Sequence, residues 1–210
     1  MTQTFAASRI TTPARCPARF VPGRAASGHP AQQGFSLIEV SIVTAIVLLL
    51  AVIAIPALGS YLVENKVPKV GQELARFVVQ TKVNASGVAS DPYAGIATTN
   101  LANVVSGSGV LTVGGTEAAP EVGHGLGSEG LVTVAAEGSG TGFTLTLTKV
   151  NNAACPGLAS VMQRVVDTIT VTPDAGASTT LKSSTVDYNA LQAEAGCEKG
   201  DVNTFVFTAA

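Results

Sequence analysis

A single carboxylate lies directly before a long apolar run in the segment GFSLIEV, residues 34–40. Residues 40–58 contain no charged residue, and a run of about 20 apolar residues is long enough to cross a bilayer as a helix. A helix is expected because backbone amides inside a membrane must find their hydrogen-bond partners within the segment. An unpaired carboxylate near a hydrocarbon core costs several kcal/mol, so Glu39 is a candidate functional residue.

Charge is distributed unevenly along the chain. Residues 1–34 carry four arginines and no acid, whereas the remainder carries 8 basic and 14 acidic residues, a net charge of −6. Positive charge before an apolar span keeps that flank cytoplasmic, which predicts export of the C-terminal part. A net negative exported part makes nucleic acid an unlikely partner, since nucleic-acid binding requires a basic surface.

Residues 1–33 predict a basic leader without regular structure, because four prolines interrupt any helix. An ordinary secretory signal places its apolar core before the cleavage site. Here the plausible cut, the bond between Gly34 and Phe35, precedes the apolar run. Cleavage would therefore remove the leader and leave the membrane helix on the mature protein.

The stretch GFSLIEVSIVTAIVLLLAVIAIPALGSY resembles the N-terminus of type IV pilins. That family has glycine before the cut, often phenylalanine after it, glutamate at the fifth mature position and a proline near the end of an apolar helix. Gly34, Phe35, Glu39 and Pro56 match these positions. The resemblance implies a prepilin peptidase that cleaves after Gly34 and N-methylates Phe35.

The N-terminal helix is predicted to continue to residue 90. Five apolar residues recur at spacings of four and three: Val63, Val67, Val70, Leu74 and Phe77. They form a stripe on one helical face, which is expected to hold a β-sheet domain; a short coiled-coil seam is the alternative. Pro56 and Pro68 each remove a helix hydrogen bond and predict kinks.

Three regions follow: a cleaved leader at 1–34, a long helix at 35–90 and a globular head at 91–210. Within the helix, residues 35–58 would form the membrane segment and later the filament core. The predicted fold class is α+β, with the long helix packed on a C-terminal antiparallel sheet.

The first part of the head, residues 91–130, is rich in glycine and predicts loops, with a short strand near 110–113 and a short helix before it. Residues 131–135 and 143–150 then alternate apolar and hydroxyl side chains, as half-buried strands do. The glycines at 138–142 predict a hairpin loop between them.

Cys155 and Pro156 predict the start of a helix, since proline is favoured in a first turn. Its apolar face is expected to consist of Leu158, Val161, Met162, Val165 and Val166. Further strands are predicted at 169–172, near Val186 and at 204–208, the last with Phe205 and Phe207 on one face.

Cys155 and Cys197 both lie in the exported part, where an oxidising compartment permits a disulfide. A bridge that closes a loop of this size would add roughly 4 kcal/mol of stability. Two separate buried thiols are the alternative. The resemblance favours the bridge, because major pilins commonly enclose a C-terminal region this way; Cys16 would leave with the leader. The segments around both cysteines and the long leader resemble type IVb pilins, including those of conjugative thin pili.

No catalytic constellation is visible in the exported part. His124 is the one histidine there, and neither a nucleophile motif nor a second ligand at metal spacing accompanies it. It is expected to be solvated in a glycine-rich loop. We expect no enzymatic activity, no cofactor and no metal.

The sequence thus predicts the major structural subunit of a type IV pilus, an inner-membrane precursor that becomes part of an extracellular filament for adhesion, conjugation or related functions. Its expected partners are further copies of itself, the prepilin peptidase and the inner-membrane assembly machinery. Glu39 is expected to pair with the Phe35 amine of a subunit already in the filament. The alternatives are a type II secretion pseudopilin, which usually lacks the cysteine pair, and a minor tip pilin acting as an adhesin.

Overall fold

The computed structural model describes residues 36–85 and 90–210. The chain divides into two units, Met1–Val43 and Thr44–Ala210, and the helix α1 (Leu37–Ala85) begins in the first and continues into the second. The helical assignment passes through Pro56 and Pro68 without a break, and the kinks at these residues remain predictions. α1 is described as far as Ala85, and residues 86–89 of the predicted helix lie outside the described residues.

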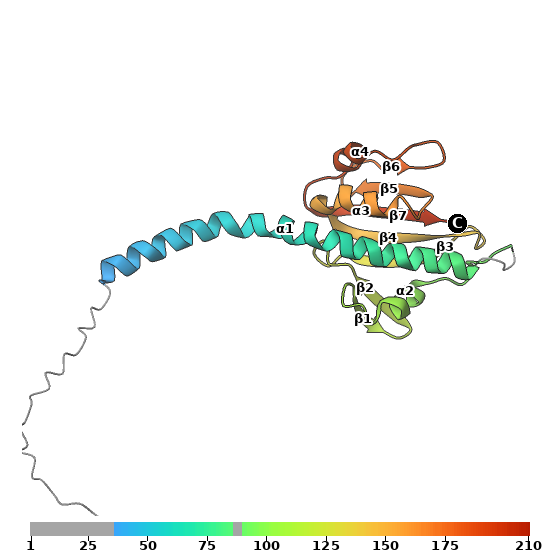
Figure 1. The fold of residues 1–210 in the computed structure, drawn as a ribbon, viewed down its shortest axis with the longest axis horizontal. Coiled ribbons are helices and arrows are strands. Elements are labelled where there is room, and N and C mark those ends of the chain that lie inside the picture. Colours follow the sequence, from blue (N-terminus) through green and yellow to red (C-terminus); the bar gives the residue numbers. More distant parts are fainter. Residues whose placement is uncertain (1–35, 86–89) are drawn as a thin grey trace, which may run out of the picture. The chain divides into compact units, whose positions relative to one another are not determined.

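In the described residues, seven strands form one antiparallel sheet in the order β1-β2-β3-β4-β7-β5-β6 (Figure 1). The strands are β1 (Thr112–Thr116), β2 (Ala119–Gly123), β3 (Leu131–Glu137), β4 (Gly142–Asn151), β5 (Thr168–Pro173), β6 (Thr179–Lys182) and β7 (Asp201–Ala209). The shorter helices are α2 (Thr98–Val105), α3 (Cys155–Met162) and α4 (Ala190–Ala195), with a 3-10 turn η1 (Asn152–Ala154) before α3. The last strand, β7, inserts between β4 and β5, so the C-terminal segment completes the middle of the sheet.

The second half of α1 packs across one face of this sheet (Figure 1). Val67, Val70, Leu74 and Phe77 are buried, and Val63 is partly buried beside them. The Phe77 ring meets Phe143 of β4 edge-on, with 6.3 Å between ring centroids. The predicted stripe and its role against a sheet are confirmed. Each fully buried side chain of this kind contributes about 1.5–3 kcal/mol.

The strands alternate as the sequence predicted from residue 131 onward. On β4 the buried residues include Phe143, Leu145 and Leu147, and the threonines between them are half-buried. On β7, Phe205 and Phe207 share the buried face, and their rings stack with centroids 5.6 Å apart. One face of the sheet therefore meets α1, while the other carries mainly threonine, as is common in antiparallel sheets.

Two parts of the head differ from the prediction. The segment 91–130 contains the predicted short helix, α2, and the strand β1 overlaps the predicted strand near 110–113, but β2, which completes a hairpin with β1, was not predicted. β1 is rich in glycine, and Pro120 lies in a part of β2 that pairs with β1 but not with β3. Proline is tolerated there because the strand needs hydrogen bonds on one side only.

The strand near Val186 was also wrong, since β6 lies earlier, at Thr179–Lys182. The helix α4 was not predicted because six residues are too few to show a helical period. α3 ends at Met162, so Val165 and Val166 follow the helix rather than extending its face. Val166 is nevertheless buried in the core.

Candidate functional site

The predicted cleavage residues, Gly34 and Phe35, lie outside the described residues. The first described residue is Ser36, whose carbonyl accepts a hydrogen bond from the Val40 amide at 3.1 Å. Glu39 lies in the first turn of α1 and is exposed. An acid at this position interacts favourably with the positive end of the helix dipole.

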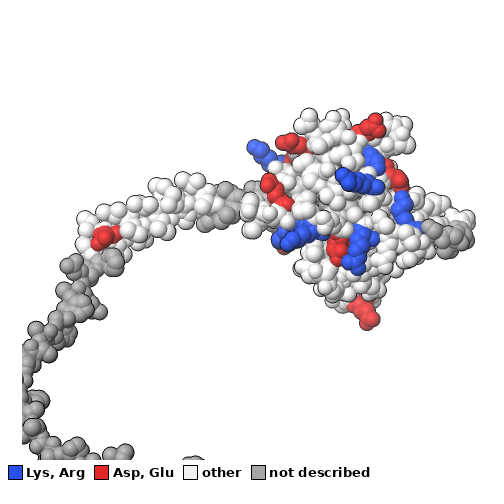
Figure 2. Space-filling model, in the orientation of Figure 1, with Lys and Arg blue, Asp and Glu red and all other residues white. Residues whose placement is uncertain are grey.

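The segment Leu37–Ala54 of α1 is apolar on all sides. Its mean hydropathy is 2.8 and no part of it is buried, so by length and composition it could cross a membrane. Leu37, for example, is 89% exposed. The Ser41 hydroxyl donates to the Ile38 carbonyl at 2.9 Å, which satisfies this polar group within the helix. Figure 2 shows this part of α1 without charge apart from one acidic group near its start.

An exposed apolar surface of this size marks an interaction with lipid or with another protein chain. A helix that is apolar all round is normally buried or inside a membrane. The exposed apolar surface is therefore suited to contact with lipid or with other protein chains. One carboxylate, that of Glu39, lies at the beginning of this surface.

The cysteines are bonded as predicted. Cys155, at the start of α3, and Cys197, after α4, form a disulfide with 6.6 Å between their Cα atoms. The closed segment contains α3, β5, β6 and α4. Lys182 of β6 donates to the carbonyls of Gln163 and Val166, which fixes the C-terminal end of α3 inside this segment.

Asn203 of β7 is a buried residue that the sequence analysis missed. Its side-chain nitrogen donates to the carbonyls of Val150 and Glu198, at 3.0 and 2.9 Å, and its oxygen accepts from the Glu198 amide. These bonds hold the segment after Cys197 against the end of β4. The signal was present in the sequence, because Asn203 alternates with Phe205 and Phe207 on the inward face of β7.

His124 is buried, so the prediction of a solvated histidine was wrong. One ring nitrogen, Nδ1, accepts from the Leu126 amide at 3.0 Å, and Nε2 lies 2.8 Å from the Thr148 carbonyl. Because the amide must donate and the carbonyl must accept, the ring is neutral with its proton on Nε2. Burial lowers the pKa of His124, although the Thr148 carbonyl and the charge of Asp201 act in the opposite direction.

The fit around His124 requires a glycine opposite the ring. A Cβ atom added to Gly130 would approach the His124 Nε2 far inside van der Waals contact. The Gly130 carbonyl also accepts from the His124 amide at 3.2 Å. His124 and Gly130 therefore close the loop between β2 and β3, and they position this loop against Thr148 of β4.

Asp201, at the start of β7, connects the same loop to the end of β4. Its carboxylate accepts from the Ser128 amide at 2.7 Å and from the Asn151 side chain. Burial is the largest influence on the carboxyl and raises its pKa, but the hydrogen bonds from Asn151 and Ser128 outweigh it and hold the pKa below the usual value. The carboxylate thus acts as a structural acceptor at the junction of β4 and β7.

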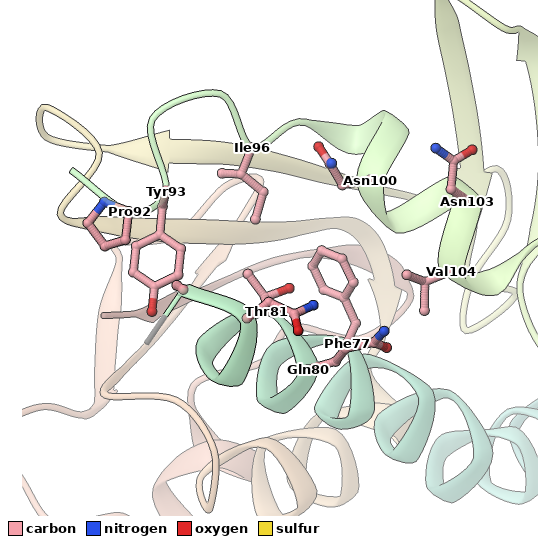
Figure 3. Close-up of a pocket in the computed structure, with 11 residues that line it drawn as sticks. Phe77, Gln80, Thr81, Pro92, Tyr93, Ile96, Asn100, Asn103 and Val104 are labelled. Atoms are coloured by element: carbon pink, nitrogen blue, oxygen red, sulfur yellow. The ribbon is translucent and has the colours of Figure 1, made fainter. Parts of the chain in front are cut away.

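A cleft of about 410 Å³ lies between the end of α1, the turn at residues 92–96 and α2 (Figure 3). Its lining includes the apolar side chains of Phe77, Tyr93 and Ile96 and the amide side chains of Gln80 and Asn100. Among the described residues that line this cleft, none is charged. In the described residues, no group of three or more His, Cys, Asp or Glu side chains could hold a metal ion.

Two family models match the chain. The model described as the prokaryotic N-terminal methylation motif matches residues 29–55, and the model described as PilS N terminal matches residues 71–210, two thirds of the chain. The first covers the predicted cleavage bond, Glu39 and the apolar half of α1. The second covers the rest of α1 and the head. No curated protein shows a significant match.

Proposed function

The chain belongs to the type IV pilin family, and on this premise we propose that it is the major structural subunit of a type IVb pilus. Members of this family are structural subunits of pili rather than enzymes. The observation that carries the proposal is the exposed apolar half of α1, which continues into a half with one apolar stripe buried against the sheet.

Before assembly, the apolar half of α1 would anchor the precursor in the inner membrane with the head exported. Extraction into a filament exchanges lipid contacts for contacts between helices of neighbouring copies. Because lipid tails and apolar side chains are similar environments, this exchange has no large desolvation cost. The prepilin peptidase and the inner-membrane assembly machinery are the partners that this route requires.

Glu39 is proposed to set the register of assembly. In a core of apolar helices an unpaired carboxylate would be costly, whereas an ion pair in good geometry is tolerated. The amine of Phe35 would be created by the proposed cleavage, and Phe35 precedes Glu39 by four residues in the sequence. Pairing between Glu39 of an incoming subunit and the Phe35 amine of a subunit already in place would exclude one-turn slips.

The assignment to a major subunit is supported by the presence of Glu39 and by a compact head without large insertions. The assignment to type IVb is supported by the cysteine-containing segments and the long leader. Adhesion, conjugation and related surface functions are all open to such a filament, since each uses the exposed surface of the heads.

Electron microscopy of shed filaments, combined with intact-mass analysis of their subunit, tests this function. The subunit should begin at Phe35 with a methylated amine and should be the main component of the filaments. A subunit that retains residues 1–34, or one that is processed but stays in the membrane, would contradict the proposal. The second result would favour a pseudopilin.

The role of Glu39 is tested with Glu39→Gln, which keeps the shape of the side chain and removes its charge. We expect normal cleavage and membrane insertion but a filament yield reduced at least tenfold. A wild-type filament yield from a processed Glu39→Gln subunit would contradict the proposed ion pair. The charge of Glu39 would then interact only with the helix dipole, and assembly would not require it.

A further inference from the structure

The edge strand β1 is open on one side in the described part of the chain. It pairs with β2 only, and all five of its residues are exposed. Its sequence, TVGGT, contains neither a charge nor a proline, the features that commonly protect an edge strand from pairing with another chain. β1 is therefore a candidate position for the addition of a further strand.

The register of the sheet identifies backbone groups of β1 that face this open side. Between β2 and β3, the His124 amide donates to the Gly130 carbonyl at 3.2 Å. Hydrogen-bonded and non-hydrogen-bonded pairs alternate along an antiparallel ladder, so Val122, two residues earlier, also turns its N–H and C=O toward β3. Val113 lies opposite Val122 on β1. The N–H and C=O of Val113 therefore point away from β2, where an added strand can bond to them.

A hollow borders β1 on each face of the hairpin. One, of about 510 Å³, is shared with α2 and is lined by Val113, Glu117 and Pro120 among others. The other, of about 320 Å³, is shared with the loop between β2 and β3 and is lined by Thr112 and Glu121 among others. Pro120 and Glu121 are successive residues of β2 and so point to opposite faces. Alternate side chains of an added strand would meet the two hollows in turn.

The surroundings of β1 are acidic. Glu117, in the turn of the hairpin, and Glu121, on β2, are exposed and have no cationic partner within 4 Å among the described residues. Glu129, beside Glu121 in the second hollow, is already paired with Lys149 at 3.0 Å. Figure 2 shows an acidic group at the tip of the lobe that β1 and β2 form. Residues 83–148 contain no lysine or arginine and five acids: Asp91, Glu117, Glu121, Glu129 and Glu137.

The parts of the chain itself are poor candidates for this added strand. In the described residues, β6 is the other edge of the sheet, and its single cation, Lys182, donates to two backbone carbonyls of its own chain. Two β1 edges would bring Glu117 and Glu121 of both copies together, and like charges across strands are unfavourable. The leader, residues 1–34, is basic, but it stays on the cytoplasmic side in the proposed topology.

We propose that β1 binds an extended basic segment of another protein by adding it to the sheet as a further strand. Backbone bonds to Val113 supply affinity, and the two hollows select the side chains, as in other cases of strand addition. Lysine or arginine side chains lie on the face of Glu121, and apolar side chains lie in the hollow beside α2, next to Val113, which is 41% exposed. The inference goes beyond the proposed function and does not depend on it, since one head can bind such a segment without a filament.

Binding of labelled peptides to the full-length subunit in detergent micelles, followed by fluorescence anisotropy, tests the proposal. The probe is a peptide with blocked ends in which lysine and valine alternate. One control peptide has the same composition, with all lysines in one block and all valines in another. A second control keeps the alternating sequence but carries N-methylated amides, which cannot donate hydrogen bonds. The alternating peptide should bind at least tenfold more tightly than either control.

Two sets of variants locate the binding. Glu117→Lys with Glu121→Lys should weaken binding of the alternating peptide at least tenfold. Asp91→Lys with Glu137→Lys is the matched control, because it changes the charge equally at residues that line neither hollow, and should leave binding within threefold of wild type. Val113→Pro removes the outward N–H, a position where an edge strand tolerates proline, and should weaken binding at least tenfold. Val113→Ala keeps the N–H and should weaken it less than threefold.

Protease resistance of the head and formation of the Cys155–Cys197 disulfide confirm that each variant folds. If Val113→Pro does not fold, the N-methylated peptide decides whether backbone bonds are needed. Equal binding of the alternating and block peptides would reduce the interaction to general charge attraction and overturn the proposal. Wild-type binding in Val113→Pro, or equal losses in the two charge-reversed pairs, would also overturn it. A subunit that binds no peptide, but self-associates until Val113→Pro abolishes the association, would assign the edge to a second copy instead.

Discussion

The two halves of α1 belong to one helix and yet present different surfaces. In the second half, Val67, Val70, Leu74 and Phe77 form a stripe that is buried against the sheet. In the segment Leu37–Ala54, apolar residues surround the helix, and no part of them is buried. One continuous helix therefore packs against the head in its second half and exposes an apolar surface in its first half.

The difference between the two halves shows how one helix can use one segment to fold the head and another to associate with lipid or other chains. A stripe with charged residues such as Lys69 and Arg76 beside it can satisfy only one partner, which here is the sheet of the same chain. A helix that is apolar all round can contact lipid or several neighbouring helices. Changes in the second half should therefore affect the stability of the head, and changes in the first half should affect assembly.

The largest expected effect on the head comes from Phe77→Ala. Loss of this buried ring leaves a cavity beside Phe143 and should lower the free energy of unfolding by about 3–5 kcal/mol. Ile46→Ala, in the exposed half, should change the stability of the head by less than about 0.5 kcal/mol. Urea unfolding of the detergent-solubilised subunit, followed by protease protection of the head, measures both.

The same two variants should exchange their ranks in an assembly assay, with Ile46→Ala reducing the amount of filament formed per folded subunit. Equal destabilisation of the head by both variants would contradict the separate roles assigned to the two halves of α1. It would mean that the apolar segment also contributes to the fold of the head.

The disulfide gives the next largest effect, and it acts only on the head. Cys197→Ser opens a loop whose ends are 42 residues apart, and should lower stability by about 4 kcal/mol or less. The Cys16→Ser variant is the control, since Cys16 is removed with the leader if processing occurs as proposed. Reducing and non-reducing unfolding curves of wild type should differ as much as Cys197→Ser differs from wild type. Identical curves would show that the bond does not contribute to stability.

These contrasts follow regularities that were readable from the sequence. The stripe on α1 and the alternating strands β3, β4 and β7 were predicted, because a period of 3.6 or 2 repeated over many residues is a strong signal. The hairpin of β1 and β2 lacked that signal, since TVGGT and APEVG interrupt any alternation with glycine and proline. These strands form because they pair with each other and, through Val122 and Gly123, with β3.

His124 was misjudged for a different reason. Its burial depends on Thr148, which lies 24 residues later, and on the absence of a side chain at Gly130. A local pattern of glycines around a histidine is the same whether the ring is solvated or enclosed. Whether the ring is buried depends on the register between the loop and β4, and that register is set only in the folded sheet.

A smaller loss of head stability is expected from Asn203→Ala. This variant also tests whether buried hydrogen bonds stabilise the head independently of α1. Removing the side chain leaves the Val150 carbonyl and the Glu198 amide without their partner, which should cost about 1–3 kcal/mol. Thr204→Ala, on the opposite face of the same strand, is the matched control and should cost less than 1 kcal/mol. Equal losses in the two variants would show that the network around Asn203 contributes nothing specific.

The smallest expected effect is a dependence of head stability on pH that comes from His124. Its folded-state pKa is lowered from the ordinary value of 6.5 by burial, so above pH 6.5 the ring is neutral in both the folded and the unfolded chain. Below pH 6.5 the unfolded chain binds a proton that the folded chain does not. Stability should therefore fall as pH falls from about 6.5 toward the folded-state pKa, by at most about 1.4 kcal/mol per pH unit.

Residues 35–210 contain no second histidine, and the lowered pKa of Asp201 acts in the same direction but at more acidic pH, below its ordinary value of 3.8. The window between pH 5 and 6.5 thus isolates His124. In His124→Gln the head should be less stable at pH 7.5, and the slope in this window should disappear, as measured by urea unfolding at a series of pH values. A slope that persists in His124→Gln would assign the effect to another group and would remove His124 from the account of the head's stability.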